Sequence, residues 1–124
     1  MANFGYPEKY QRLQKLAGFL GKEIPGPMGS FGQLHQKALA DGAIPRKTKE
    51  LIALGIAISA RCEGCVAYHV HDALKAGAER HEVLETIGVA LMMGGGPAFI
   101  YGCEALDALD EFESRRRANV SQAA

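Results

Sequence analysis

The chain has 124 residues and a hydrophobic fraction of 48%, which fits one domain with its own core. Its 14 basic and 14 acidic residues give a formal net charge of zero, so the charge balance indicates neither a nucleic-acid-binding protein nor one bound to an anionic membrane. The N-terminus, MANFGYPEKY, has no apolar signal core, and no stretch reaches the roughly 18–20 apolar residues of a membrane span. We therefore expect a single domain over residues 1–124, located in the cytoplasm.

The apolar residues recur with helical spacing almost throughout, and no period-2 alternation predicts a strand. A first helix is expected over residues 7–21. The segment GKEIPGPMG, with its glycines and prolines, should end it, and a second helix is expected over residues 29–40. The side chains predicted to face inward are Tyr10, Leu13, Leu16, Ala17 and Leu20 in the first helix and Phe31, Leu34 and Leu39 in the second.

A third helix should begin after Pro45, a residue suited to a first helical turn, and run through RKTKELIALGIAISA. Further helices are expected over residues 62–77, 80–93 and 97–117. The turn near residues 59–62 is so short that the third and fourth helices should form an antiparallel pair. The sequence therefore predicts an all-α fold of about six helices.

Two of these helices contain the segments LIALGIAIS and VLETIGVALMM, which are apolar on nearly every side. A helix of that kind is usually fully buried, but a chain of this length has a limited interior. We therefore expect part of this surface to be buried between subunits of a homo-oligomer.

The segment ARCEGCVAYHVH, residues 60–71, holds two of the three cysteines and two of the four histidines. A close cysteine pair in a cytoplasmic chain indicates a metal site or a redox-active thiol pair rather than a structural disulfide. With Cys62 at zero on a wheel of about 100° per residue, Cys65 falls at about 300° and His69 at about 340°. His71 falls at about 180°, on the opposite side. We therefore group His69 with the cysteines and expect it to lean back toward Cys65.

An imidazole beside a thiol can accept its proton or stabilise its thiolate, and the N-terminus of a helix adds partial positive charge. A second thiol three residues away can then close a disulfide once the first has been oxidised. In an antiparallel pair, Glu50 should lie level with His69, just before a nearly apolar run. A carboxyl group withdrawn from water in this way is suited to pass a proton, so we expect a relay of Glu50, His69 and Cys65.

The spacing of Glu50, Cys62, Cys65 and His69 resembles the E-x11-C-x2-C-x3-H signature of the AhpD-like alkylhydroperoxidases, within the carboxymuconolactone decarboxylase superfamily. The resemblance covers residues 39–106, over half of the chain. Some members of that family carry a histidine directly before the second cysteine, where this chain has Gly64. This departure puts an additional relay step in question, and with it the full peroxidase rate.

The resemblance implies an all-α domain that assembles as a homotrimer or homohexamer and acts as a thiol-dependent peroxidase or disulfide reductase in antioxidant defence. It implies that Cys65 attacks the peroxide, that Cys62 resolves the product as a disulfide, and that Glu50 and His69 relay protons. The substrate would be a small hydroperoxide or disulfide, the reductant a thiol or lipoyl group, and no cofactor is expected.

Three alternatives remain open. The first is a zinc site on Cys62, Cys65 and His69, which would need a fourth ligand. The second is a decarboxylase of a carboxylated lactone in aromatic catabolism, a chemistry that does not need a thiol pair. The third is a non-catalytic, redox-sensing subunit. The remaining cysteine, Cys103, is expected to be a small buried hydrophobic residue, and His71 a surface or interface residue.

Overall fold

The structure, a computed structural model, describes residues 5–123, which form six α-helices and no strand. The helices are α1 (Tyr6–Glu23), α2 (Pro25–Leu39), α3 (Arg46–Ser59), α4 (Glu63–Lys75), α5 (Arg80–Gly94) and α6 (Gly96–Ala123). The expected all-α fold is therefore confirmed. Two boundaries differ from prediction by more than two residues. α2 begins four residues early, because the prolines of the interrupting segment fall in its first turn, where no amide donor is required. α6 continues past residue 117 to Ala123.

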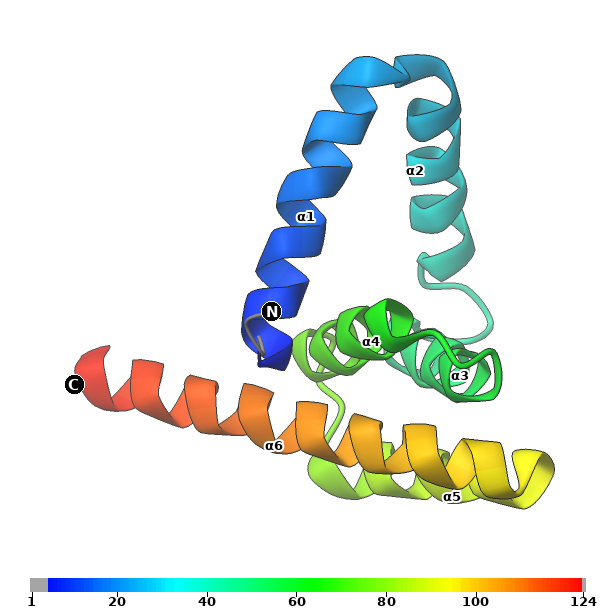
Figure 1. The fold of residues 1–124 in the computed structure, drawn as a ribbon, viewed down its shortest axis with the longest axis vertical. Coiled ribbons are helices and arrows are strands. Elements are labelled where there is room, and N and C mark those ends of the chain that lie inside the picture. The colour runs from blue at the N-terminus through cyan, green and yellow to red at the C-terminus, as the bar shows by residue number, and fades with distance from the viewer. Residues whose placement is uncertain (1–4, 124) are drawn as a thin grey trace.

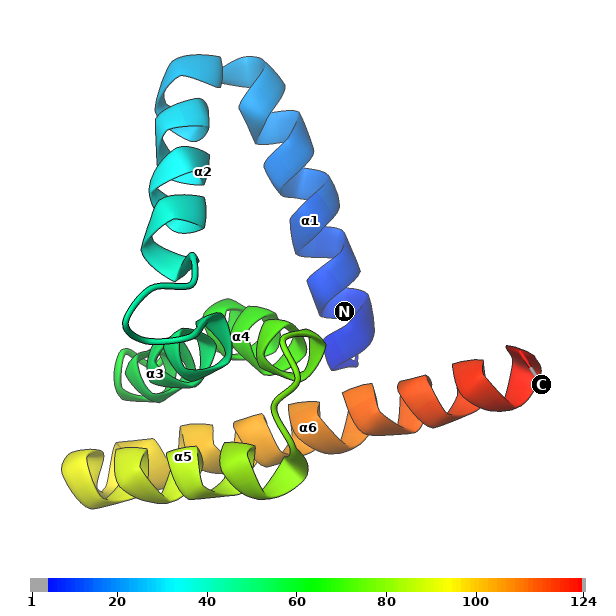
Figure 2. The ribbon, with the colours of Figure 1, turned by 180° about the vertical axis from the view of Figure 1, so that it is seen from behind.

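The helices form two packed layers and a projecting hairpin (Figure 1). α3 and α4 lie side by side as an antiparallel pair, and α5 and α6 form a second antiparallel pair against them. α1 and α2 rise from this body as a hairpin, which is also clear from behind (Figure 2). Gly95, with a φ of 66°, makes the reversal between α5 and α6, a left-handed conformation that costs glycine little.

The core lies where α3 and α4 meet α5 and α6. Its largest fully buried apolar side chains are Leu54, Ile58, Val66, Val70, Val83 and Leu109. Burying each such side chain is worth roughly 1.5–3 kcal/mol, so these residues hold the two helix pairs together. The N-terminal turns of α1 join this core through Tyr6 and Tyr10, which anchor the base of the hairpin.

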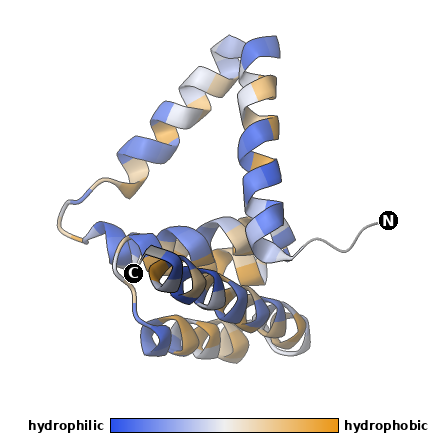
Figure 3. Ribbon diagram, turned by 90° about the vertical axis from the view of Figure 1, so that its left-hand side faces the viewer, coloured by the Kyte–Doolittle hydropathy of each residue, from blue (hydrophilic) through white to orange (hydrophobic). Residues whose placement is uncertain are grey.

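Several apolar residues of the hairpin are exposed where the sequence predicted burial, although Tyr10 and Leu39 are buried as expected. Phe31 and Leu34 were expected to face inward, yet each is 62% exposed. Leu16 and Leu20 are also exposed, and Figure 3 shows hydrophobic residues along both arms of the hairpin. Helical spacing identifies an apolar face but does not show which element covers it. In the described chain, these side chains of the hairpin are left exposed.

A second apolar surface lies on α3 and α5. One side of α3 packs into the core, and Ile52 and Ile56 on its other side are exposed. Together with Val89 and Met93 of α5 they line an open apolar cavity of about 590 Å³. The described helices include none that is long and apolar enough to cross a lipid bilayer.

Candidate functional site

The turn between α3 and α4 determines where the two cysteines lie. The amide of Arg61 donates to the carbonyl of Ile58 at 3.2 Å, and that of Cys62 donates to Ala57 at 3.1 Å. These two bonds form a Schellman motif, in which the residue after the helix cap takes a left-handed conformation. Here that residue is Arg61, with a φ of 57°, an unusual conformation for a side chain other than glycine. The reversal is therefore completed within three residues, and it places Cys62 at the N-cap of α4.

Cys62 and Cys65 are joined by a disulfide, with their Cα atoms 5.1 Å apart. The backbone amide of Cys65 donates a hydrogen bond to the Cys62 sulfur at 3.2 Å, so this sulfur caps the helix in place of a serine or aspartate oxygen. The free amides of the first helical turn create positive potential at this position. The same surroundings would stabilise a thiolate on Cys62 when the disulfide opens.

Glu50 and His69 meet across the antiparallel pair, at the level that the spacing predicted. An oxygen of the Glu50 carboxylate lies 2.8 Å from Nδ1 of His69. Glu50 has no solvent exposure, and the His69 side chain is 17% exposed. A buried carboxylate is costly unless it is hydrogen-bonded or paired, and His69 provides one partner. Because Cys65 lies four residues before His69 on the regular helix α4, the pair shares the face of the second cysteine.

Two residues that the sequence analysis did not select complete the surroundings of this pair. A guanidinium nitrogen of Arg46 donates to the other Glu50 oxygen at 3.4 Å, one helical turn away. The ring of His35, from α2, stacks against His69 with centroids 6.3 Å apart. The i,i+4 spacing of Arg46 and Glu50 is a signal that sequence reasoning could have used. No such signal exists for His35, because its contact depends on how the hairpin folds back.

His35 and Arg46 also line an open cavity of about 460 Å³ next to the pair. Tyr68 lies in its wall. The pKa of the Tyr68 hydroxyl is raised by burial and by the nearby charge of Asp72, so this hydroxyl stays protonated. The lining includes the two residues that contact the pair, His35 and Arg46, but not Glu50, His69 or the cysteines themselves.

The structure explains why a glycine, rather than a residue with a side chain, suits position 64. A Cβ atom at this position would come within 3.1 Å of a methyl carbon of Leu13, on α1. That distance is tighter than ordinary van der Waals contact, so the neighbour would have to shift. A side chain at this position therefore requires Leu13 to move by a few tenths of an ångström.

Outside this group, the expectation for Cys103 is wrong. Cys103 is exposed rather than buried, because it lies on the outer side of α6, away from α5. His81, in the first turn of α5, is exposed. The described part of the chain holds no group of three or more His, Cys, Asp or Glu side chains that could bind a metal ion.

His71 lies on the opposite side of α4 from the cysteines, as the helical wheel predicted. Its Nδ1 is 2.9 Å from a carboxylate oxygen of Asp72, and its ring stacks on Tyr10 with centroids 3.8 Å apart. The Tyr10 hydroxyl donates to the same Asp72 oxygen at 3.2 Å. Burial by itself would raise the pKa of Asp72, but the bonds from His71 and Tyr10 and the charge of His71 outweigh it and hold that pKa below its ordinary value of 3.8.

Comparisons with known proteins show which proteins this chain resembles in sequence and in fold. The chain is 37% identical to an uncharacterized protein of Cupriavidus necator over 98 residues, 79% of this chain and 87% of that one. A carboxymuconolactone decarboxylase family protein of Legionella pneumophila has a crystal structure that is 41% identical in sequence, with a TM-score of 0.83. That match covers 86% of this chain and 96% of the other.

A family protein of Thermotoga maritima, 23% identical, has the same fold, with a TM-score of 0.82 over 90% of this chain and 95% of the other. The sequence model of the carboxymuconolactone decarboxylase family matches residues 25–108. This range includes the cysteine pair Cys62 and Cys65, and also Glu50 and His69. The matched residues make up more than half of the chain, and the protein belongs to the carboxymuconolactone decarboxylase family.

Proposed function

We propose that the protein is a thiol-dependent oxidoreductase that reduces a hydroperoxide or a small disulfide through a Cys62–Cys65 redox cycle. The observation that carries this proposal is the juxtaposition at the start of α4. A disulfide lies at the N-terminus of the helix, and a buried Glu50–His69 pair lies one turn further along.

The oxidative half begins with the reduced chain. The Cys65 thiolate attacks one oxygen of a hydroperoxide, the O–O bond breaks, and Cys65 becomes a sulfenic acid while an alcohol leaves with one proton. The Cys62 thiolate then attacks the Cys65 sulfur, the S–S bond forms, and water is released after a second protonation. His69 holds and returns these protons, and Glu50 orients its ring through Nδ1.

The reductive half needs an external dithiol, for which a lipoyl group or a small dithiol is chemically suitable. One of its thiolates attacks the Cys65 sulfur, and Cys62 leaves as a thiolate. The Cys65 amide, which donates to the Cys62 sulfur in the disulfide form, stabilises this leaving group. The second thiol of the reductant attacks the mixed disulfide, which releases Cys65 and leaves the reductant oxidised.

The decisive experiment is thiol titration of the reduced protein before and after one equivalent of hydroperoxide, with peptide mass mapping. We expect two thiols to be lost and a Cys62–Cys65 peptide to be found. Cys65→Ser should abolish turnover, and Cys62→Ser should stop at a sulfenic acid that dimedone traps. Cys103→Ser is the matched control and should react as the wild type does, because Cys103 is exposed on another helix. Turnover by Cys65→Ser, or two thiols that do not react, would overturn the proposal.

The proposal includes assembly as a homotrimer or homohexamer. Its support is the apolar surface left exposed by one chain, on α2, α3 and α5, where Phe31, Ile56 and Met93 are 62%, 62% and 74% exposed. Exposed apolar patches of this extent mark interaction surfaces. Light scattering should give three or six times the chain mass of 13.3 kDa. A monomer at working concentration would contradict this part of the proposal and leave the redox cycle untouched.

A further inference from the structure

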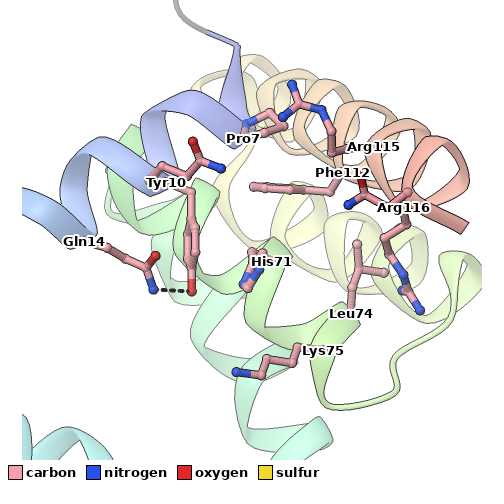
Figure 4. A pocket seen from close by; sticks show the side chains of 11 residues that line it. Pro7, Tyr10, Gln14, His71, Leu74, Lys75, Phe112, Arg115 and Arg116 are labelled. Carbon is pink, nitrogen blue, oxygen red and sulfur yellow. Dashed lines mark hydrogen bonds between the residues drawn. The ribbon is translucent and has the colours of Figure 1, made fainter. Parts of the chain in front are cut away.

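A cavity of about 610 Å³ opens on the side of α4 opposite to the cysteines, between α1, α4 and the C-terminal half of α6 (Figure 4). Its volume is within the usual range for small-molecule sites. Its lining does not include Cys62, Cys65, Glu50 or His69, although Tyr10, Gln14 and Lys75 also line the smaller cavity described above. It is lined by Pro7, Tyr10, Gln11, Gln14, His71, Leu74, Lys75, Phe112, Arg115, Arg116 and Asn119.

The charge of the cavity differs from that of the chain. The whole chain has a formal net charge of zero, but the lining holds three cations, Lys75, Arg115 and Arg116, and no carboxylate. Arg115 is paired with Glu8. Within the described chain, no carboxylate lies within ion-pair distance of Lys75 or Arg116. A cavity of this charge favours an anion, and guanidinium groups match the oxygens of a phosphate.

The interior of the cavity is aromatic. Figure 4 shows the rings of Tyr10, His71 and Phe112 together between the cationic side chains. Tyr10 stacks on His71, and Phe112 meets His71 edge-on with centroids 5.4 Å apart. Leu74 adds an aliphatic surface beside them. Tyr10 and Phe112 are only 9% and 6% exposed, so the ring that is open to the cavity is His71, whose side chain is 31% exposed. An exposed ring suits the flat body of an aromatic ligand, because aromatic faces and edges contact one another favourably.

Three carboxamides, Gln11, Gln14 and Asn119, lie in the lining. The amide nitrogen of Gln14 donates to the Tyr10 hydroxyl at 3.0 Å, which leaves its oxygen available to accept. A carboxamide offers both donors and acceptors and can pair with the nitrogen and oxygen atoms on the edge of a heteroaromatic ring. The lining therefore has one kind of group for each part of a nucleotide: cations for phosphate, rings for the base, and amides for its edge.

We propose that this cavity binds a small heteroaromatic phosphate, of the size of a mononucleotide. The site is separate from the redox pair and does not depend on the proposed redox function. His71, which sequence reasoning placed at a surface, contributes its ring to the wall of this cavity. Lys75 and Arg116 supply the charge that the phosphate requires.

The test is isothermal titration of the purified protein with three kinds of probe: the four ribonucleoside monophosphates, their nucleosides, and inorganic phosphate. We expect at least one monophosphate to bind saturably with one site per chain, and roughly tenfold more tightly than its nucleoside or phosphate alone. Arg116→Met and Lys75→Met should each weaken that binding several-fold, and both replace exposed side chains that the fold does not need.

The matched control is Arg117→Met, which removes the same charge from the neighbouring residue of α6, outside the cavity lining. It should bind as the wild type does. If phosphate alone binds as tightly as the monophosphate, the cavity is only a basic patch and the proposal fails. Equal losses in Arg116→Met and Arg117→Met, or no binding by any of the four monophosphates, would also overturn it.

Discussion

His69 and His71 lie two residues apart on α4, and each has its Nδ1 close to a carboxylate, at 2.8 and 2.9 Å. The surroundings of the two pairs are nevertheless different. Glu50 comes from another helix and has no solvent exposure, whereas Asp72 is the next residue along the chain and is 15% exposed. His69 stands one turn from a disulfide, and His71 stacks on a tyrosine.

Under the proposed function, the difference in burial, and not the contact distance, assigns the proton relay to Glu50 and His69. A carboxylate removed from water and placed level with a redox-active residue can direct a proton to it. A carboxylate shared between a histidine and a tyrosine hydroxyl, as Asp72 is, mainly joins two helices. The α4 face with Cys65 and His69 should therefore control the reaction, and the face with His71 should control stability and ligand binding.

The largest effect is expected from Glu50→Gln. The substitution keeps the shape of the side chain but removes the negative charge beside Nδ1 of His69, which orients its ring. We expect the rate of Cys65 oxidation by hydroperoxide to fall about 100-fold, the scale typical for loss of a general acid–base group. The rate is measured by quenching with an alkylating agent at timed intervals and counting unreacted thiols by mass spectrometry.

Asp72→Asn is the matched control, because it makes the same carboxylate-to-amide change beside the other histidine. We expect its oxidation rate to stay within about twofold of the wild type. Equal losses in both variants would show that the two faces of α4 are not functionally distinct. A wild-type rate in Glu50→Gln would remove Glu50 from the relay.

A stability effect is expected on the opposite face. Tyr10 is 9% exposed, contacts His71 and Phe112, and donates to Asp72. Tyr10→Ala should lower the free energy of unfolding by about 3 kcal/mol, since it removes a buried aromatic ring. Tyr10→Phe, which removes only the hydrogen bonds, should cost about 1 kcal/mol. Urea denaturation followed by circular dichroism measures both. A loss in Tyr10→Phe as large as in Tyr10→Ala would mean that the hydroxyl, not the ring, anchors α1.

Much of the fold could be predicted from the sequence because its signals are local. Each signal depends only on residues that are close in the sequence: the 3.6-residue apolar period, the proline before α3 and the short turn before Cys62. The helices that these signals predict are present. The predictions that fail concern which element covers the apolar face of a helix. Phe31 and Leu34 have helical spacing, yet they are exposed because α1 and α2 project from the body.

The same distinction applies to the candidate site. Glu50 and His69 could be paired from sequence because a tight turn fixes the register of α3 against α4. His35 could not, since its stacking on His69 depends on the path of residues 40–45 between α2 and α3. Cys103 was misassigned for a related reason: its apolar neighbours predicted burial, but they alternate around α6 between the face toward α5 and the outer face.

The smallest effect expected is on the pH dependence of stability, and it again separates the two faces of α4. The pKa of Asp72 is held below 3.8 in the folded chain, because the bonds from His71 and Tyr10 outweigh the effect of burial. A carboxyl whose folded pKa is depressed contributes stability that is present above its unfolded pKa and is lost as the pH falls through the folded value. The free energy of unfolding should therefore decrease as the pH falls below about 4. Urea denaturation between pH 2.5 and 6 should give a steeper decrease for the wild type than for Asp72→Asn, since other carboxylates, including Glu8, titrate equally in both. Parallel curves would mean that the Asp72 carboxylate has the same proton affinity in the folded and unfolded chain, and that the contacts of His71 and Tyr10 hold α1 on α4 by packing alone.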